Sequence, residues 1–427
     1  MASSKRATSD SDIRDQHAAR KVPRLDSSRV HASCSLSYPS TSQPPTRPAP
    51  FQRPRPLISF SYDTNRQLEF SEAAMRYYVS PPSGADLGHG YERWIRRPEE
   101  RGRLDGLLRA ISEIRKRGTD PVVSIVSWRG VMTKILTAPY EDRDGWELNV
   151  MAIRGTLYLE EFIDDARLKE KDNMTPRHRM QTYYGYAFES WCTASSPDVP
   201  SGWGGDVDTN VQWCSVVKTK LGDTRMVIGG EVDCVRDRYN GHNDAMLELK
   251  TSMAIRGHRD EMRFEKKLLK FYFQSFLLGV PEIVVGFRTP NGQLVTVQSY
   301  KTLEIPRLVR GKQDAWDPQI CLSWGDRFLT WIKSNVEQPG NAAPGSVWRV
   351  KFTPCVGVEL ALLREEERRE VEAGEDRVGF LPRWYYEEIQ DLSSSNAHSC
   401  GDTFGAEPQP TRSSASTTGV LPAGWQI

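Results

Sequence analysis

The chain has 427 residues, of which 26% are charged and 38% are apolar, with 57 Lys and Arg against 56 Asp and Glu. This composition excludes collagen, a coiled-coil rod and a chain without any folded part. No run of about 18 apolar residues occurs, so we expect no membrane span. The seven cysteines include no CxxC pair, which argues against a structural zinc site and a disulfide framework.

The two ends of the chain differ from its middle. Residues 1–55 carry ten Lys and Arg against four Asp and Glu, a net charge of +6, with too few apolar residues to pack a core. Residues 393–427 are rich in Ser, Thr, Gly and Pro. We therefore expect a disordered basic head over 1–53, one large folded domain over 54–392 and a disordered tail. The basic clusters of the head fit either a nuclear import signal or a merely solvated segment.

Apolar spacing and turn residues predict a mixture of helices and strands in the middle. Helices are expected at residues 104–114, 183–191, 264–278 and 322–336, the second opened by Thr175-Pro176 and the last by Asp317-Pro318. Strands are expected at residues 122–126, 211–219, 226–235, 245–250, 283–287 and 294–300. Turn residues at Gly222-Asp223 and Asn240–Asp244 predict hairpins between the runs that they separate. This order predicts a single α+β domain with mixed β-sheets flanked by helices.

Charged side chains that could take part in catalysis or metal binding concentrate on two of these strands. Glu231 and Asp233 stand two residues apart, as do Glu248 and Lys250, so each pair is expected on one face of its strand. If the hairpin closes, the four side chains converge, and three carboxylates repel one another unless a cation neutralises them. Oxygen ligands suit Mg²⁺ or Mn²⁺, and the lysine would orient water or neutralise a phosphate. Charges that alternate along a solvent-facing strand would give the same pattern.

The pattern is similar to the signature of the PD-(D/E)xK nuclease superfamily, and longer matches narrow the resemblance. In chain order these are Trp128-Arg129-Gly130-Val131-Met132-Thr133-Lys134, Gly185-Tyr186-Ala187-Phe188-Glu189, Glu231-Val232-Asp233, Glu248-Leu249-Lys250, Gln274-Ser275-Phe276-Leu277-Leu278-Gly279-Val280-Pro281 and Arg377-Val378-Gly379-Phe380-Leu381-Pro382. Together they resemble the decapping-and-exoribonuclease (DXO) family, in particular its fungal nuclear branch. The resemblance spans roughly residues 54–391 and leaves both tails uncovered.

The resemblance implies a metal site built from carboxylates. Glu189, Asp233 and Glu248 would be ligands, Glu231 would act directly or through water, and the backbone carbonyl of Leu249 would be a further ligand. The implied fold has a PD-(D/E)xK nuclease-like core, and the implied cofactor is Mg²⁺ or Mn²⁺. A glutamate on a helix is by default a surface residue, so the assignment of Glu189 depends on the other motifs that accompany it in the sequence.

The resemblance also implies contacts with a substrate. Lys250 and Gln274 would hold the scissile phosphate or the attacking water, and Lys250 would share the catalytic role with the carboxylates. Trp128, Arg129 and Gly130 would contact the 5′-terminal nucleotide, and Cys214 would line its pocket. The structural alternatives are a cation–π pair for Arg129, a buried backbone cap for Gln274 and a plain core position for Cys214.

The function implied by the resemblance is metal-dependent hydrolysis at RNA 5′ ends. It would comprise removal of pyrophosphate from 5′-triphosphate RNA, removal of incomplete or NAD-type caps and, in some members, 5′→3′ degradation. A nuclear 5′→3′ exoribonuclease of the XRN type is the implied protein partner, and the nucleus is the implied compartment. The competing hypotheses are an inactive scaffold that stabilises that exoribonuclease and a DNA nuclease of the wider superfamily.

Overall fold

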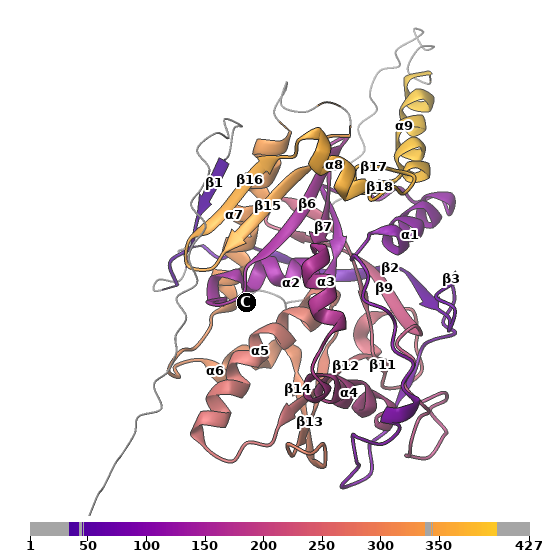
Figure 1. The fold of residues 1–427 in the computed structure, drawn as a ribbon, viewed down its shortest axis with the longest axis vertical. Helices are drawn as coiled ribbons and strands as arrows, with labels where there is room; N and C mark the ends of the chain where they lie inside the picture. Colours follow the sequence, from indigo (N-terminus) through magenta and orange to yellow (C-terminus); the bar gives the residue numbers. More distant parts are fainter. Residues whose placement is uncertain (1–33, 42–44, 46, 338–342, 344, 399–427) are drawn as a thin grey trace, which may run out of the picture. The chain divides into compact units, whose positions relative to one another are not determined.

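The structure is a computed structural model of the chain, and it describes residues 34–41, 45, 47–337, 343 and 345–398 (Figure 1). The described residues form two large β-sheets, a two-stranded ribbon and the helices packed against them. This arrangement confirms the predicted α+β class. Most of the predicted head and most of the predicted tail lie outside the described residues.

The larger sheet contains ten strands of mixed direction. Their spatial order is β1 (Cys34–Ser37), β16 (Gly357–Leu362), β15 (Trp348–Thr353), β6 (Trp146–Ile153), β7 (Thr156–Phe162), β5 (Ile125–Trp128), β10 (Thr224–Glu231), β9 (Gln212–Leu221), β2 (Phe51–Tyr62) and β3 (Leu68–Glu69). Strand β5 runs parallel to both of its neighbours. Strands β9 and β10 form the predicted hairpin around Gly222, whose φ of 55° suits a residue without a side chain.

The smaller sheet has six strands and carries part of the candidate site. Their spatial order is β14 (Leu294–Lys301), β13 (Glu282–Arg288), β12 (Met246–Met253), β11 (Cys234–Val235), β4 (Tyr77–Tyr78) and β8 (Thr193–Ala194). Strand β12 runs parallel to β13 and antiparallel to β11. The ribbon pairs β17 (Arg377–Val378) with β18 (Leu381–Pro382). Strand β12 is therefore held from both sides, which fixes the direction of its side chains.

The helices begin and end largely where the capping residues predict. They are α1 (Asp105–Lys116), α2 (Arg129–Thr137), α3 (Asp165–Asp172), α4 (Pro176–Trp191), α5 (His258–Leu278), α6 (Ile305–Val309), α7 (Pro318–Val336), α8 (Glu365–Glu372) and α9 (Arg383–His398). The Thr175 side chain accepts the first-turn amide of His178, and Asp317 accepts that of Gln319. Helix α5 starts earlier than predicted and ends, as predicted, at Gly279.

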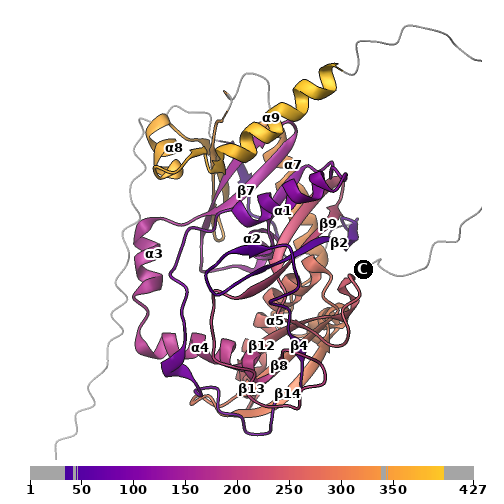
Figure 2. The same ribbon diagram turned by 90° about the vertical axis from the view of Figure 1, so that its right-hand side faces the viewer.

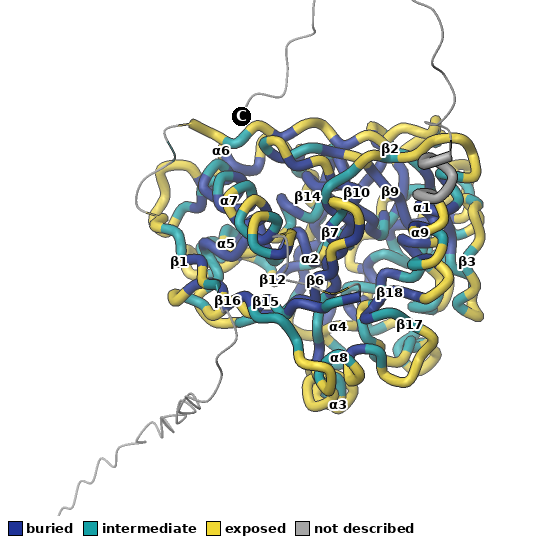
Figure 3. The backbone as a smooth tube through the Cα atoms, turned by 90° about the horizontal axis from the view of Figure 1, so that it is seen from above, coloured by how far each residue is buried: buried dark blue, intermediate teal, exposed yellow. Residues whose placement is uncertain are grey.

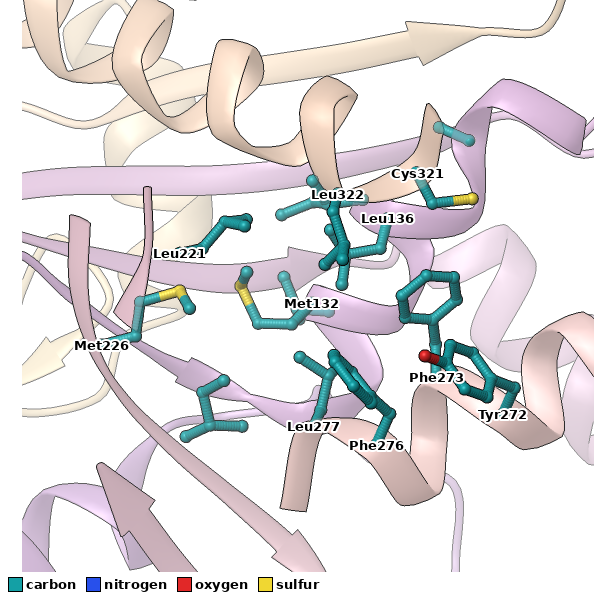
Figure 4. Close-up of a cluster of buried hydrophobic side chains, with 14 of the residues drawn as sticks. Met132, Leu136, Leu221, Met226, Tyr272, Phe273, Phe276, Leu277, Cys321 and Leu322 are labelled. Carbon is teal, nitrogen blue, oxygen red and sulfur yellow. The ribbon is translucent and has the colours of Figure 1, made fainter. Parts of the chain in front are cut away.

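Helices α2, α5 and α7 build the main core. Figure 4 shows side chains of all three meeting those of strands β9 and β10, and Figure 3 shows that the buried backbone follows the same elements. A Cβ on Gly325 of α7 would lie 2.3 Å from Leu136 Cδ2, so any larger residue would force the buried Leu136 side chain of α2 to shift. Helix α4 packs beside strand β12 of the smaller sheet (Figure 2). Dense packing of this kind fixes the helices that carry the candidate site residues.

One predicted strand is wrong, and the difference matters for the site. The run 226–235 is not a single strand, because β10 ends at Glu231 in the larger sheet and β11 starts at Cys234 in the smaller one. Asp233 therefore lies in the crossing between the sheets, and Glu231 and Asp233 do not share one strand face. Of the two halves of the predicted strand, β11 is the one that pairs with β12, as the predicted hairpin requires. The partners of each half decide the split, since β10 pairs with β5 and β9 while β11 pairs with β4 and β12.

Secondary structure at both ends of the described part lies outside the bounds predicted for the domain. Strand β1 pairs with β16, and β2 begins at Phe51, so residues that composition assigns to the head take part in the larger sheet. Helix α9 likewise continues to His398, past residue 392. Among the described residues, no helix is both long and apolar enough to cross a bilayer.

Candidate active site

Four carboxyl groups gather where the chain passes from the larger sheet to the smaller one. Glu231 ends β10, Asp233 lies in the crossing, Glu248 belongs to β12 and Glu189 to the last turn of α4. The pKa of Glu189 is raised well above its ordinary value by burial and by the negative charges of Asp233 and Glu231. The predicted convergence is therefore present, although its members come from both sheets and a helix. We call these four side chains the acidic cluster.

Two cations hold Glu248, which is completely buried. Lys250 Nζ donates to Glu248 Oε1 at 2.5 Å, and Arg129 Nη1 donates to Oε2 at 2.8 Å. Glu248 and Lys250 share a face of β12, as their spacing predicts. Arg129 reaches the cluster because the β5 strand runs directly into α2. Burial raises the pKa of Glu248, but the charges of Arg129 and Lys250 outweigh it and hold that pKa below its ordinary value.

Neutral groups hold the carboxylates of Glu231 and Asp233. Gln212 Nε2 donates to Glu231 Oε2 at 2.8 Å, and the backbone amide of Leu249 donates to Asp233 Oδ2 at 2.6 Å. Burial and the charge of Glu248 raise the pKa of Asp233 to about 7. Burial also raises the pKa of Glu231, which Arg129 opposes. The cluster therefore holds more negative charge than its two cations compensate.

The acidic cluster offers the donors that a hard divalent cation prefers, but they do not surround a common point. Among the described residues, no three Asp, Glu, His or Cys side chains stand in an arrangement that holds a metal ion. Arg129 and Lys250 engage both oxygens of Glu248 instead. Oxygen-only donors suit Mg²⁺ or Mn²⁺, and a cation would relieve the repulsion that raises the carboxyl pKa values. The donor set fits the predicted metal, and the individual ligands, including the Leu249 carbonyl, stay predictions.

Two pockets meet at Glu231. One, of about 360 Å³, is lined by Glu189, Glu231 and Asp233. The other, of about 700 Å³, is lined by Trp128, Cys214 and several arginines. Cys214 faces Glu231 across the β9–β10 pair, so its predicted place in a pocket wall agrees with the structure. Chemistry at the cluster would be open to a substrate from both pockets.

Sequence reasoning missed the arginines of the second pocket. Arg66 lies 3.7 Å above the Tyr62 ring, and Arg97 Nη1 donates to Gln212 Oε1 at 3.3 Å. Within the described part of the chain, neither arginine forms an ion pair with a carboxylate. Burial and the nearby charge of Arg97 lower the pKa of Arg66. The available signal was the five arginines between residues 93 and 103, a density typical of anion binding.

The remaining predicted residues lie near the cluster with different degrees of engagement. The Trp128 indole donates to the Arg103 carbonyl at 2.8 Å, which fixes this ring in the pocket wall. Gly130 is exposed in the first turn of α2. Gln274 is half-buried on α5, and none of the hydrogen bonds among the described residues joins it to the acidic cluster. Its predicted contact with phosphate or water stays a prediction.

Comparison with known proteins decides the family. The model described as RAI1 like PD-(D/E)XK nuclease matches residues 52–386. The chain belongs to the RAI1-like PD-(D/E)XK nuclease family. Among RAI1-like relatives, Decapping nuclease RAI1 of Mycosarcoma maydis is 36% identical over 91% of this chain and 96% of its own length. The Decapping and exoribonuclease protein of Bos taurus is 36% identical over 81% of this chain and 88% of its own length.

A solved RAI1-like structure supports the same assignment. Rai1 of Candida albicans, crystallised in complex with pU5 and Mn²⁺, gives a TM-score of 0.75 at 27% identity and covers 85% of this chain and 100% of that chain. The resemblance drawn from the motifs, the nuclease-like core and the prediction of an enzyme are thereby confirmed. The relatives carry names of nucleases, which favours an enzyme over the scaffold hypothesis.

Proposed function

We propose that this protein uses a divalent metal ion, Mg²⁺ or Mn²⁺, to hydrolyse phosphoanhydride or phosphodiester bonds at RNA 5′ ends. The observation that carries the proposal is the buried acidic cluster with Lys250 at its edge, opening into a pocket that holds Arg66 and Arg97, neither of which is in an ion pair among the residues that the structure describes. The decapping names of the RAI1-like relatives and the RNA-type ligand of the Candida albicans structure support it.

The residues of the site have different roles in this proposal, which follow from their charge and position. Arg66 and Arg97 repel one another in the second pocket, so an anionic 5′ phosphate would relieve that repulsion and be held there. Trp128 lines this pocket and the next residue, Arg129, is hydrogen-bonded to Glu248, so the two would orient the terminal nucleotide beside the acidic cluster. Lys250, held by Glu248, would stabilise the negative charge that develops on the phosphoryl oxygens.

The metal would be held by carboxylates of the acidic cluster, and its chemistry when bound is to lower the pKa of water and to stabilise the phosphoryl oxygens. In the structure, Lys250 and Arg129 form ion pairs with the two oxygens of Glu248. Metal binding at this carboxylate would therefore require both side chains to turn toward substrate oxygens. In the reaction, a water oxygen forms a bond to phosphorus and the bond to the leaving phosphate or nucleotide oxygen breaks. The proton lost by the water goes to solvent, and the leaving oxygen departs with the electron pair of the broken bond, its negative charge compensated by the cations of the site.

The finer assignments are those that the motif resemblance implies. We propose 5′-triphosphate, incompletely methylated and NAD-type caps as substrates, with 5′→3′ degradation as a further activity. We also propose a nuclear location, in RNA 5′-end quality control, and a nuclear 5′→3′ exoribonuclease as protein partner. The basic clusters of the head are the sequence feature in favour of the nucleus.

The deciding experiment incubates the full chain with four RNAs that differ only at the 5′ end, namely triphosphate, unmethylated cap, methylated cap and NAD cap. Each is tested with Mg²⁺ and with Mn²⁺, and every product is resolved. Release of pyrophosphate or of an intact cap dinucleotide is the expected result. Binding of the exoribonuclease in a pull-down without hydrolysis of any of the four ends would favour the scaffold instead.

A further inference from the structure

A groove lined by a row of cations includes the end of β12, the strand that carries Glu248 and Lys250. It has a volume of about 1090 Å³ and lies between the N-terminal half of α5, the end of β12 and residues 140–144. We call it the α5 groove. The basic side chains that line it are Arg143, Arg256, Arg263, Lys266, Lys267 and Lys270. Four of the six belong to α5, at spacings that repeat along one side of a helix.

The α5 groove begins one strand repeat from the predicted catalytic lysine. Ser252 lines the groove and stands two residues after Lys250, so both are on the same face of β12. Lys267 Nζ donates to Ser252 Oγ at 3.4 Å. Lys267 and Gln274 are seven residues apart on α5, two helical turns, and therefore lie on one side of that helix. A chain that left the acidic cluster along β12 would meet Lys267 first.

The carboxylates of the groove do not neutralise Lys267. Lys270 pairs with Glu141 at 3.0 Å and Arg263 with Asp260 at 3.5 Å. The groove wall contains three further aspartates, Asp142, Asp144 and Asp314. No ion pair within the described part of the chain involves Lys266, Lys267 or Arg256. Some cations of the groove are thus paired with carboxylates, whereas the end of the groove next to Ser252, where Lys267 lies, keeps its positive charge.

A buried arginine reinforces this positive charge from behind the groove wall. Arg288 is opposite Met253 in the β12–β13 pair and is only 8% exposed. Its Nη1 donates to Thr289 O at 3.1 Å, and its Nε is without a hydrogen-bond partner among the described residues. Partial desolvation and the charge of Arg288 lower the pKa of Lys267. Two cations that repel one another beside an open groove are stabilised when an anion binds between them and solvent.

The geometry points to the α5 groove as the binding site for the phosphates of the RNA chain that follows the reacting 5′ end, with Lys267 as the contact nearest the acidic cluster. This inference rests on the proposed function, because it assumes that the end in the cluster belongs to RNA. The rings of Phe264 and Trp316 in the groove wall are buried. The half-buried Tyr140 is held in the wall by its hydroxyl, which accepts the Asp317 amide, so the wall presents little aromatic surface for base stacking. Binding in the groove is therefore directed at phosphates and independent of base sequence.

The test compares Lys267→Gln with Lys218→Gln, an exposed lysine of β9 outside the groove. Fluorescence anisotropy in EDTA measures binding of a labelled dinucleotide and of a single strand of about twelve nucleotides. For Lys267→Gln, the Kd of the longer strand should rise about tenfold and its salt slope should fall by about 0.7, while the dinucleotide is unaffected. Lys267→Arg should bind like the wild type, and Lys218→Gln should bind both ligands normally.

Two outcomes overturn the inference. Equal affinity of Lys267→Gln and Lys218→Gln for the longer strand would show that RNA does not use the groove. Equal weakening for both ligands would make Lys267 part of the 5′-end site instead. Because the assay needs no hydrolysis, it decides the groove even if the four-RNA experiment rejects the proposed function, and a failure of the groove leaves end hydrolysis untouched.

Discussion

The acidic cluster and the α5 groove meet on the same strand but leave opposite charges uncompensated, carboxylates in the cluster and Lys267 in the groove. At the cluster, burial and the negative charge of Glu248 raise the pKa of Asp233 to about 7. The negative charge of the four carboxyl groups exceeds what Arg129 and Lys250 compensate. In the groove, Arg288 and partial desolvation lower the pKa of Lys267. Each region is thus unfavourable for its own charges. The comparison teaches that neither is optimised for the stability of the free protein, as expected where ligands complete the charge balance.

Removal of divalent ions should separate the two regions most clearly. Excess EDTA should stop hydrolysis of 5′-triphosphate RNA, and Mn²⁺ or Mg²⁺ should restore it, because the acidic cluster needs a cation to act. Millimolar Mg²⁺ should also raise the melting temperature, since only the folded chain has an assembled site. Binding of RNA to the α5 groove should persist in EDTA, because lysines require no metal. Full hydrolysis in excess EDTA would contradict the metal-dependent mechanism.

Loss of two cluster carboxylates should abolish chemistry without unfolding the protein. Glu231→Ala combined with Asp233→Ala should lower hydrolysis at least about a hundredfold. Stability in the absence of metal should stay unchanged or rise slightly, because relieved repulsion offsets the lost bond to the Leu249 amide. Hydrolysis assays and thermal melts on one preparation check both points, with Glu359→Ala on the exposed face of β16 as control. A mutant that does not fold would make the cluster structural.

Arg129 should contribute to the stability of the fold as well as to substrate binding. Arg129→Gln leaves the buried carboxylate of Glu248 with Lys250 alone, so the free energy of unfolding should fall by about 3 kcal/mol at neutral pH. The pKa of Glu248 is depressed in the folded protein, so this stabilisation is present above the ordinary glutamate pKa and disappears as the pH falls below it. Urea titrations at several pH values measure the difference. Arg225→Gln, on the exposed side of β10, should cost little.

The smallest effect is a pH dependence specific to the acidic cluster. The pKa of Asp233 is raised to about 7 in the folded protein, so the folded state keeps a proton that the unfolded state has lost. In the absence of metal, stability should therefore be greatest below the ordinary aspartate pKa and fall progressively as the pH rises toward and through about 7. Asp233→Asn should flatten this slope, whereas Lys267→Gln in the groove should leave it unchanged. Identical slopes in wild type and Asp233→Asn would reject the raised pKa.

The sequence by itself determined the parts of the site that depend on local geometry. The spacing of Glu248 and Lys250 places both on one face of a strand whatever surrounds it, and the structure joins them at 2.5 Å. Thr175 and Asp317 cap their helices through bonds within the first turn. The ordered motifs also identified the family, because several short matches in one order are hard to produce by chance. These features need only neighbours along the chain.

Tertiary structure alone decided where the carboxylates meet and what faces them. Strand pairing splits the run around Val232 between two sheets and moves Asp233 into the crossing. The pairing of Arg129 with Glu248 joins residues 119 positions apart, and nothing local in either segment encodes it. The α5 groove likewise exists only because helix α5 folds back along β12, bringing Lys267 to Ser252. Contacts between distant segments depend on the packing of the whole core, which no single stretch of sequence specifies.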